Sequence, residues 1–170
     1  MILDGYWKKE LKHNIRHIKM WIKLSRIFGG FAEHQINKYT LYSAIVIRKM
    51  HEDETHGKKE IKKAKRPMPP FKLLEHKVNV TVYPFSGDKE FIVERVVPDN
   101  YDYNNIVEKE IELNTLCNQI IHSFVWETAR EQETNKFLGL LFASDMAKET
   151  VLYLLEPQEF INAIEFCIDI

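Results

Sequence analysis

Two amphipathic segments joined by a glycine pair place the strongest constraint on how this chain folds. Residues 4–26 carry large apolar side chains at steps of three and four, which is the period of one face of an α-helix. These side chains are Trp7, Leu11, Ile15, Ile18 and Ile22. Residues 32–54 repeat the pattern, and Gly29-Gly30 between the two segments suits a helix end followed by a chain reversal. We therefore expect an antiparallel helical hairpin over residues 1–54.

The segment that follows the hairpin has a different composition. Residues 55–70 combine a run of basic side chains with three prolines in four positions, a pattern typical of an exposed loop. The basic residues are Lys58, Lys59, Lys62, Lys63, Lys65 and Arg66. No aromatic residue is interleaved among them to stack on bases, so such a run attracts phosphate without reading sequence, or is simply a solvated loop.

The remaining residues, 71–170, read as a mixture of strands and helices. We expect strands at 78–82, 90–97, 137–143 and 150–155, a long helix over 105–129, and a final helix opened by Pro157. The order of elements is then ααββαββα. The sequence predicts one α+β domain over residues 1–170, in which the helical hairpin packs with a four-stranded antiparallel sheet and two further helices.

Charge is divided unevenly along the chain, although the net charge is only −1. Residues 1–66 hold 16 Lys and Arg against 7 Asp and Glu, whereas residues 67–170 hold 8 against 18. Such a division favours either a nucleic-acid face on the basic half or two halves that dock on one another. Both readings remain open at this point.

The compartment is indicated by the cysteines and by the N-terminal segment. Cys117 and Cys167 are the only cysteines and have no CxxC spacing, which is typical of a reducing compartment. The first twenty residues are charged throughout, unlike a signal peptide, and no apolar window is long enough to span a bilayer. We expect a cytoplasmic protein that does not enter a membrane.

The candidate site lies within residues 116–124, where Asn118 and His122 stand four apart in an otherwise apolar run. On a helical wheel both lie away from the main apolar face, on a second side of the helix that we expect to contact another element. One hypothesis makes His122 a general acid or base whose tautomer Asn118 fixes. The alternative is a hydrogen-bonded histidine that joins this helix to its neighbours.

One local resemblance supports the catalytic hypothesis. Residues 117–122 are similar to the Arg-Asn-x-x-x-His motif of the HEPN superfamily of ribonucleases, in which the arginine and the histidine act on the scissile phosphate. Here Cys117 occupies the arginine position, and a neutral thiol cannot stabilise developing negative charge. The copy of the motif is therefore degenerate unless another cation, such as Arg48 or Arg130, takes the place of the arginine. HEPN domains are also entirely helical, in contrast to the strands expected here.

A second resemblance covers most of the chain. Residues 42–50, residues 116–123, and Ala143-Ser144-Asp145 followed by Leu152-Tyr153 resemble an uncharacterised bacterial family of small proteins. The resemblance implies a shared set of polar positions that meet in one place. They are Arg48, Lys49, Asn118, His122, Ser123, Ser144 and Asp145. Such a group would suit a phosphate or carboxylate ligand, or equally a buried network that fixes packing.

No pattern in the sequence indicates a metal or a cofactor. The spacing of His51 and His56 is not that of zinc hydrolases, and there is neither a GxSxG elbow nor a glycine-rich phosphate loop. The leading hypothesis is a non-enzymatic cytoplasmic interaction or regulatory protein that binds a protein partner or a second copy of itself. The alternative is a nuclease-like or nucleic-acid-binding protein that uses Arg48, His122 and the basic run.

Overall fold

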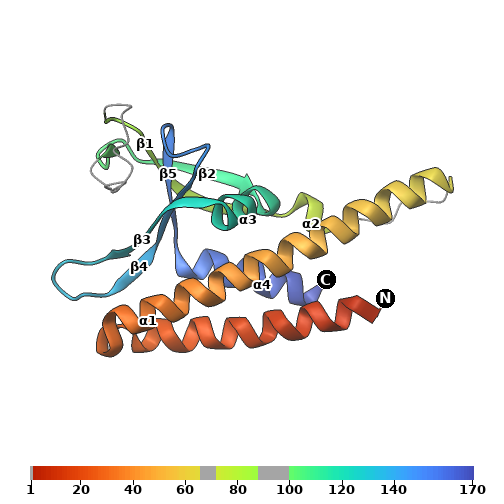
Figure 1. Ribbon diagram of the computed structural model, residues 1–170, viewed down its shortest axis with the longest axis horizontal. Helices are drawn as coiled ribbons and strands as arrows, with labels where there is room; N and C mark the ends of the chain where they lie inside the picture. Colours follow the sequence, from red (N-terminus) through yellow and green to blue (C-terminus); the bar gives the residue numbers. More distant parts are fainter. Residues whose placement is uncertain (1, 66–71, 88–99) are drawn as a thin grey trace.

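The computed structural model describes residues 2–65, 72–87 and 100–170 and shows an α+β fold with an antiparallel sheet (Figure 1). The described strands form one five-stranded sheet in the order β2-β1-β5-β4-β3. The elements are α1 (Ile2–Lys63), α2 (Lys72–Glu75), β1 (Lys77–Pro84), β2 (Val107–Glu112), α3 (Leu113–Ile121), β3 (Ser123–Arg130), β4 (Phe137–Ser144), β5 (Val151–Leu155) and α4 (Pro157–Asp169). The expected α+β class is confirmed, although the number of strands differs from the expected four.

The helix α1 consists of two arms that run side by side in opposite directions (Figure 1). We call residues 2–28 the first arm and residues 30–63 the second arm. Between them Gly29 has a φ of 45° and a ψ of −125°, a backbone conformation outside the helical region. A residue without a Cβ adopts such a conformation at little steric cost, so the glycine pair sets the point of reversal.

The second arm continues to Lys63, so the prediction of a loop beginning at residue 55 is wrong. Lys and Glu are good helix formers, and a Glu60–Lys63 ion pair with an N···O distance of 2.7 Å links adjacent turns. Lys62 and Lys63 also lie at the helix C-terminus, where positive charge is favourable. The helix ends before Lys65, which has a positive φ of 52°. The proline-rich remainder of the predicted loop, residues 66–70, lies outside the described residues.

The predicted long helix over residues 105–129 is also wrong, because that segment contains β2, α3 and β3. Strand β2 pairs antiparallel with β1, with Ile111 opposite Val78. Strand β3 pairs with β4, with Trp126 opposite Phe142. Only the nine residues of α3 keep helical geometry. The expected strand over residues 90–97 falls outside the described ranges, so it stays a prediction.

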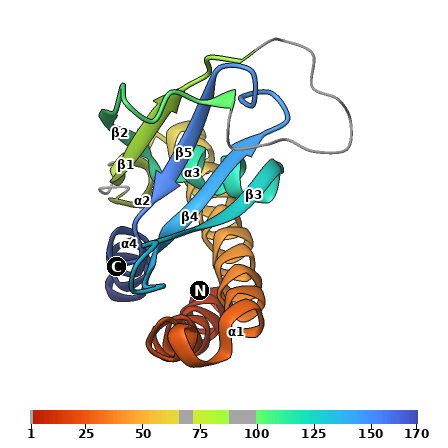
Figure 2. The same ribbon diagram turned by 90° about the vertical axis from the view of Figure 1, so that its left-hand side faces the viewer.

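The main core lies on one face of the sheet, where α3, α4 and the second arm are packed together (Figure 2). Several large side chains in this core have less than 2% of their surface exposed, including Ile47, Leu116, Ile120, Phe142, Leu155 and Ile164. Each such side chain contributes roughly 1.5–3 kcal/mol through burial. Pro157 stands in the first turn of α4, as expected from its fixed φ. A smaller cluster on the opposite face contains Tyr101 and Leu152.

Within the described part of the chain, no helix is both long enough and apolar enough to cross a membrane.

The backbone conformation of Gly29 predicts that substitution by alanine destabilises the protein more at Gly29 than at Gly30. Gly29→Ala should lower the free energy of unfolding by about 1–3 kcal/mol, because an L-residue is strained at this φ and ψ. Urea denaturation followed by circular dichroism measures the change. Gly30→Ala is the matched control, since its added Cβ meets no atom within 4 Å and its φ is not positive. Equal midpoints for the two variants would contradict the strained reversal.

Candidate functional site

The end of α3 determines where His122 lies. His122 leaves the helix with a φ of −102° and a ψ of 24°, and its backbone N–H donates to the carbonyl of Asn118. The Ser123 hydroxyl oxygen lies 2.8 Å from the carbonyl oxygens of both Gln119 and Ile120, which share its one proton. These contacts satisfy carbonyl groups that a helix end otherwise leaves unpaired. The helix therefore stops sharply, and the His122 side chain stands exposed at its end.

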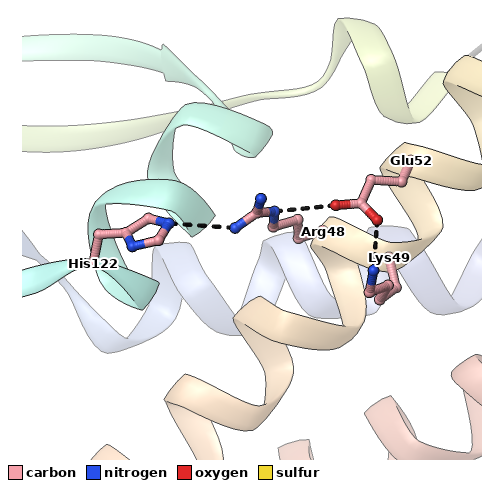
Figure 3. Close-up of polar contacts among 4 residues, drawn as sticks. All are labelled: Arg48, Lys49, Glu52 and His122. Atoms are coloured by element: carbon pink, nitrogen blue, oxygen red, sulfur yellow. Dashed lines mark hydrogen bonds and ion pairs between the residues drawn. The ribbon is translucent and has the colours of Figure 1, made fainter.

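The second arm brings Arg48 to this imidazole. Nη1 of Arg48 lies 3.4 Å from Nε2 of His122, although the two residues are 74 positions apart in the sequence (Figure 3). A guanidinium has donors only, so a hydrogen bond at this contact needs Nε2 to be the acceptor. The sequence-based expectation of a substitute cation near His122 named Arg48 or Arg130, and Arg48 is the one that lies there.

Glu52 orients the Arg48 side chain from the next turn of the second arm. Its Oε1 accepts from Nε of Arg48 at 3.2 Å, and its Oε2 accepts from Nζ of Lys49 at 2.7 Å (Figure 3). The hydrogen bond from Lys49 is the main cause of a lowered pKa for the Glu52 carboxyl, and the charges of Lys49 and Arg48 add to it. The carboxylate is therefore ionised at neutral pH and holds both cations on one side of the helix.

These ion pairs contribute little to stability. The side chains of Arg48, Lys49 and Glu52 are 37%, 55% and 45% exposed. Exposed pairs at helical spacing are worth only about 0.3–0.5 kcal/mol each. The contacts around Arg48 are therefore not what holds the fold together.

Asn118 does not take the role proposed from the sequence. Its backbone carbonyl accepts the His122 N–H, but within the described residues no side-chain hydrogen bond joins Asn118 to the imidazole. A residue that sequence reasoning missed makes the connection to the sheet instead. The side chain of Gln119 accepts from the backbone N–H of Ser144 at 3.3 Å. Glutamine is common on helix surfaces, so the sequence alone did not predict that Gln119 contacts the sheet.

The loop after β4 lies next to the end of α3. Ser144 is buried and stands opposite Ser123 in the β3–β4 register, and the N–H of Asp145 donates to the carbonyl of His122 at 3.3 Å. The Asp145 carboxylate, however, is paired with Lys148. The structure therefore brings Arg48, His122, Ser123, Ser144 and Asp145 close together. The carboxylate of Asp145 nevertheless pairs with Lys148 and not with His122 or Arg48.

The basic run lies on the projecting end of the second arm rather than at the imidazole. Its described members Lys58, Lys59, Lys62, Lys63 and Lys65 are exposed. Lys58 is ten residues beyond Arg48, or about 15 Å along a helix that rises 1.5 Å per residue. Arg66 lies outside the described residues. Arg130 is also remote, since its guanidinium pairs with Glu33 near the reversal of α1.

The position that holds arginine in the HEPN motif cannot carry charge here. Cys117 is fully buried in the main core, and burial raises the pKa of its thiol far above the ordinary value. Burial also raises the pKa of Cys167 to about 12. Both thiols are free. Neither is an available nucleophile, and no group of three or more His, Cys, Asp or Glu side chains in the described ranges could hold a metal.

A comparison of the chain with protein-family models, with curated proteins and with solved structures finds no match in any of the three. We therefore infer function from the geometry alone.

The buried thiols predict slow chemical modification. Burial raises the pKa of both thiols, so at pH 8 both are almost wholly protonated, whereas the thiolate is the reactive form. We expect neither cysteine to react rapidly with Ellman's reagent in the folded protein, and both to react once guanidinium chloride has unfolded it. Rapid reaction of one thiol under native conditions would contradict the burial of that cysteine.

Proposed function

We propose that the protein is a non-enzymatic interaction protein of the cytoplasm that binds an anionic group of a protein partner at Arg48, beside His122. The observation that carries the proposal is the 3.4 Å contact between Nη1 of Arg48 and Nε2 of His122 on a partly exposed surface (Figure 3). The two free thiols support a reducing compartment.

A phosphate or carboxylate fits this surface for reasons of hydrogen-bond geometry. The contacts with Glu52 and His122 use two of the five N–H groups of the Arg48 guanidinium. The remaining planar donors match two oxygens of an anion, which is the strongest pairing available to arginine. Glu52 holds the guanidinium in place, so less conformational freedom is lost when an anion binds.

Binding is favoured over catalysis because His122 lacks the surroundings of a general base. In catalytic histidines a second group usually holds one ring nitrogen while the other exchanges the proton. Within residues 2–65, 72–87 and 100–170, no side chain hydrogen-bonds to Nδ1 of His122, and its Nε2 faces Arg48. Asp145, whose backbone N–H donates to the carbonyl of His122, has its carboxylate paired with Lys148.

A protein partner is favoured by an apolar tip at the reversal of α1. Ile27, Phe28 and Phe31 have 75%, 50% and 57% of their surface exposed. Trp21 supports the two phenylalanines through edge-on ring contacts, with centroids 6.1 and 5.3 Å away. Exposed aromatic clusters of this kind anchor protein interfaces. The tip lies about 25 Å along the second arm from Arg48, which a folded partner could span.

RNA binding with cleavage is the second candidate, and one observation favours it. Arg48 stands beside His122 and so supplies the cation that the resembling motif lacks at Cys117. The lysines of the projecting second arm would extend the positive surface toward a nucleic-acid backbone.

The proposed function predicts a large effect of Arg48→Gln on the binding of anionic peptides. The probes are two fluorescently labelled peptides with neutral flanking residues, one containing phosphoserine and the other serine, measured by fluorescence anisotropy. The wild type should prefer the phosphopeptide. Arg48→Gln should weaken this binding about tenfold or more, because a hydrogen bond to a charged group is worth about 1.5–3 kcal/mol.

Arg16→Gln is the matched control for that measurement, since Arg16 is an exposed arginine of the first arm. It should leave the dissociation constant unchanged. Equal affinity for the two peptides, or equal loss in both variants, would reject an anion site at Arg48.

The second candidate predicts a different outcome with nucleic acid. The protein is incubated with RNA and with single-stranded DNA at low salt, beside His122→Ala and a variant in which the lysines of residues 58–65 are changed to glutamine. Cleavage by the wild type that is lost in His122→Ala would show that the protein is a nuclease and would reject the non-enzymatic proposal. Cleavage that survives in His122→Ala would reject the site assignment. We expect neither binding nor cleavage, which would remove the second candidate.

A further inference from the structure

A groove runs between the second arm and β3, the strand at one edge of the sheet (Figure 2). Its volume is about 620 Å³. Leu41 and Tyr42 line it from the arm, and Ile121 and Trp126 line it from α3 and β3. The Tyr42 ring is 48% exposed, so it is available to a molecule that enters the groove.

The second arm and β3 run in opposite directions along this groove and contact each other near both of its ends. Arg130, the last residue of β3, pairs with Glu33 near the reversal of α1. His122, directly before β3, contacts Arg48. Fifteen positions separate Glu33 from Arg48, which is about 22 Å along a helix. An extended segment of about seven residues covers that length.

The strand β3 leaves one edge of its backbone unpaired. It pairs with β4 on one side, and no segment within the described residues pairs with its other side. In an antiparallel strand every second residue directs its N–H and C=O toward such an edge. The register with β4 is regular from Val125 to Ala129, so this stretch offers evenly placed donors and acceptors.

The two edge strands of the sheet differ in how readily they would accept another strand. Residues 108–110 of β2 are Glu, Lys and Glu, all exposed, and charged side chains on an edge strand discourage pairing with another chain. The strand β3 instead contains Phe124, Val125, Trp126 and Thr128, which are residue types that favour strands. Of the two edges, β3 is therefore the one that suits an added strand.

The side chains around the groove favour an acidic occupant. His34 and Lys38 belong to its lining, and no Asp or Glu does so. Ser123, at the far end of the lining, follows His122, and the guanidinium of Arg48 lies beside that imidazole. A negative segment would meet complementary charge along this surface, which fixes its position and speeds its association.

We propose that the partner presents its anionic group on an extended acidic segment, which binds in this groove as an additional strand antiparallel to β3. Main-chain hydrogen bonds to β3 supply affinity, and alternate side chains lie against Leu41 and Tyr42. Antiparallel pairing is the more stable arrangement, and it puts the C-terminal end of the segment at Arg48. The inference rests on the proposed function, because it names the form in which the partner carries the anion.

The probe is a pool of synthetic peptides of about seven residues with phosphoserine fixed at an amidated C-terminal end. The other positions alternate between Val, Ile or Leu and Glu, Asp or Thr. Peptides retained on the immobilised full chain are sequenced, and the most abundant one is measured by fluorescence anisotropy. We expect the chain to retain members of the pool. Retention no greater than that on serum albumin would overturn the proposal.

Methylation of the peptide amides tests strand pairing directly. Two versions of the selected peptide are made, one N-methylated at the odd positions and the other at the even positions. An added strand uses only every second amide toward β3, so one version should bind at least about tenfold more weakly and the other almost as well as the parent. Equal affinities of the two versions would overturn the proposal.

Replacing phosphoserine by serine separates this inference from the proposed function. If the unphosphorylated peptide binds equally well while the two methylated versions still differ, the anion site at Arg48 is rejected and the added strand is supported. If phosphate is required but the methylated versions do not differ, the anion site stands and the added strand is overturned.

Tyr42→Ser tests whether the segment lies in the groove. It should weaken binding of the selected peptide about tenfold, because the exposed ring would be buried by the bound segment. Tyr6→Ser is the matched control, since Tyr6 is an exposed tyrosine of the first arm, and it should leave the affinity unchanged. Circular dichroism establishes that both variants are folded. Unchanged affinity in folded Tyr42→Ser would overturn the assigned groove.

Sedimentation velocity distinguishes a partner segment from a second copy of the chain. The chain alone should be monomeric, and it should bind one peptide per chain. A dimer that the peptide dissociates would show that a second copy occupies β3, and would overturn the assignment of this edge to a partner's segment.

Discussion

The packing of the second arm of α1 against α3 is the contact on which the rest of the structure depends. Ile47 from the arm and Leu116 and Ile120 from α3 are almost wholly buried in one cluster with the inner face of the sheet. Ser43 and Ala44 are also fully buried, and small side chains at a helix contact allow close approach of the axes. This contact places Arg48 beside His122 and encloses one side of the groove that contains Trp126.

The contacts that stabilise the fold differ from the contacts at the surfaces that we assign to binding. Burial of the core contributes roughly 1.5–3 kcal/mol per large side chain, whereas the exposed ion pairs around Arg48 contribute a few tenths each. The end of α3 is held by backbone and side-chain hydrogen bonds of Ser123 and Gln119. His122 and Arg48 can therefore be replaced while the elements that position them remain intact.

Much of the helical and strand pattern could be predicted because it follows from local chemistry. The apolar period of the first arm, the glycine pair, the alternating valines of β1 and the proline that opens α4 each act within a few residues. The segment containing β2 and β3 could not be read in this way. Its apolar residues fit a helical spacing as well as a strand, and only pairing with β1 and β4 decides between them.

The sequence alone determined the α+β class, the reversal at the glycines and the polar positions around Asn118 and His122. It could not determine which of these groups meet. Arg48 and His122 are 74 positions apart, Glu33 and Arg130 are 97 apart, and their pairing follows from how the second arm crosses the sheet. Side chains distant in sequence are brought together only by the burial of apolar surface over the whole chain. For that reason the tertiary structure, and not the local pattern, selected Arg48 as the cation beside His122.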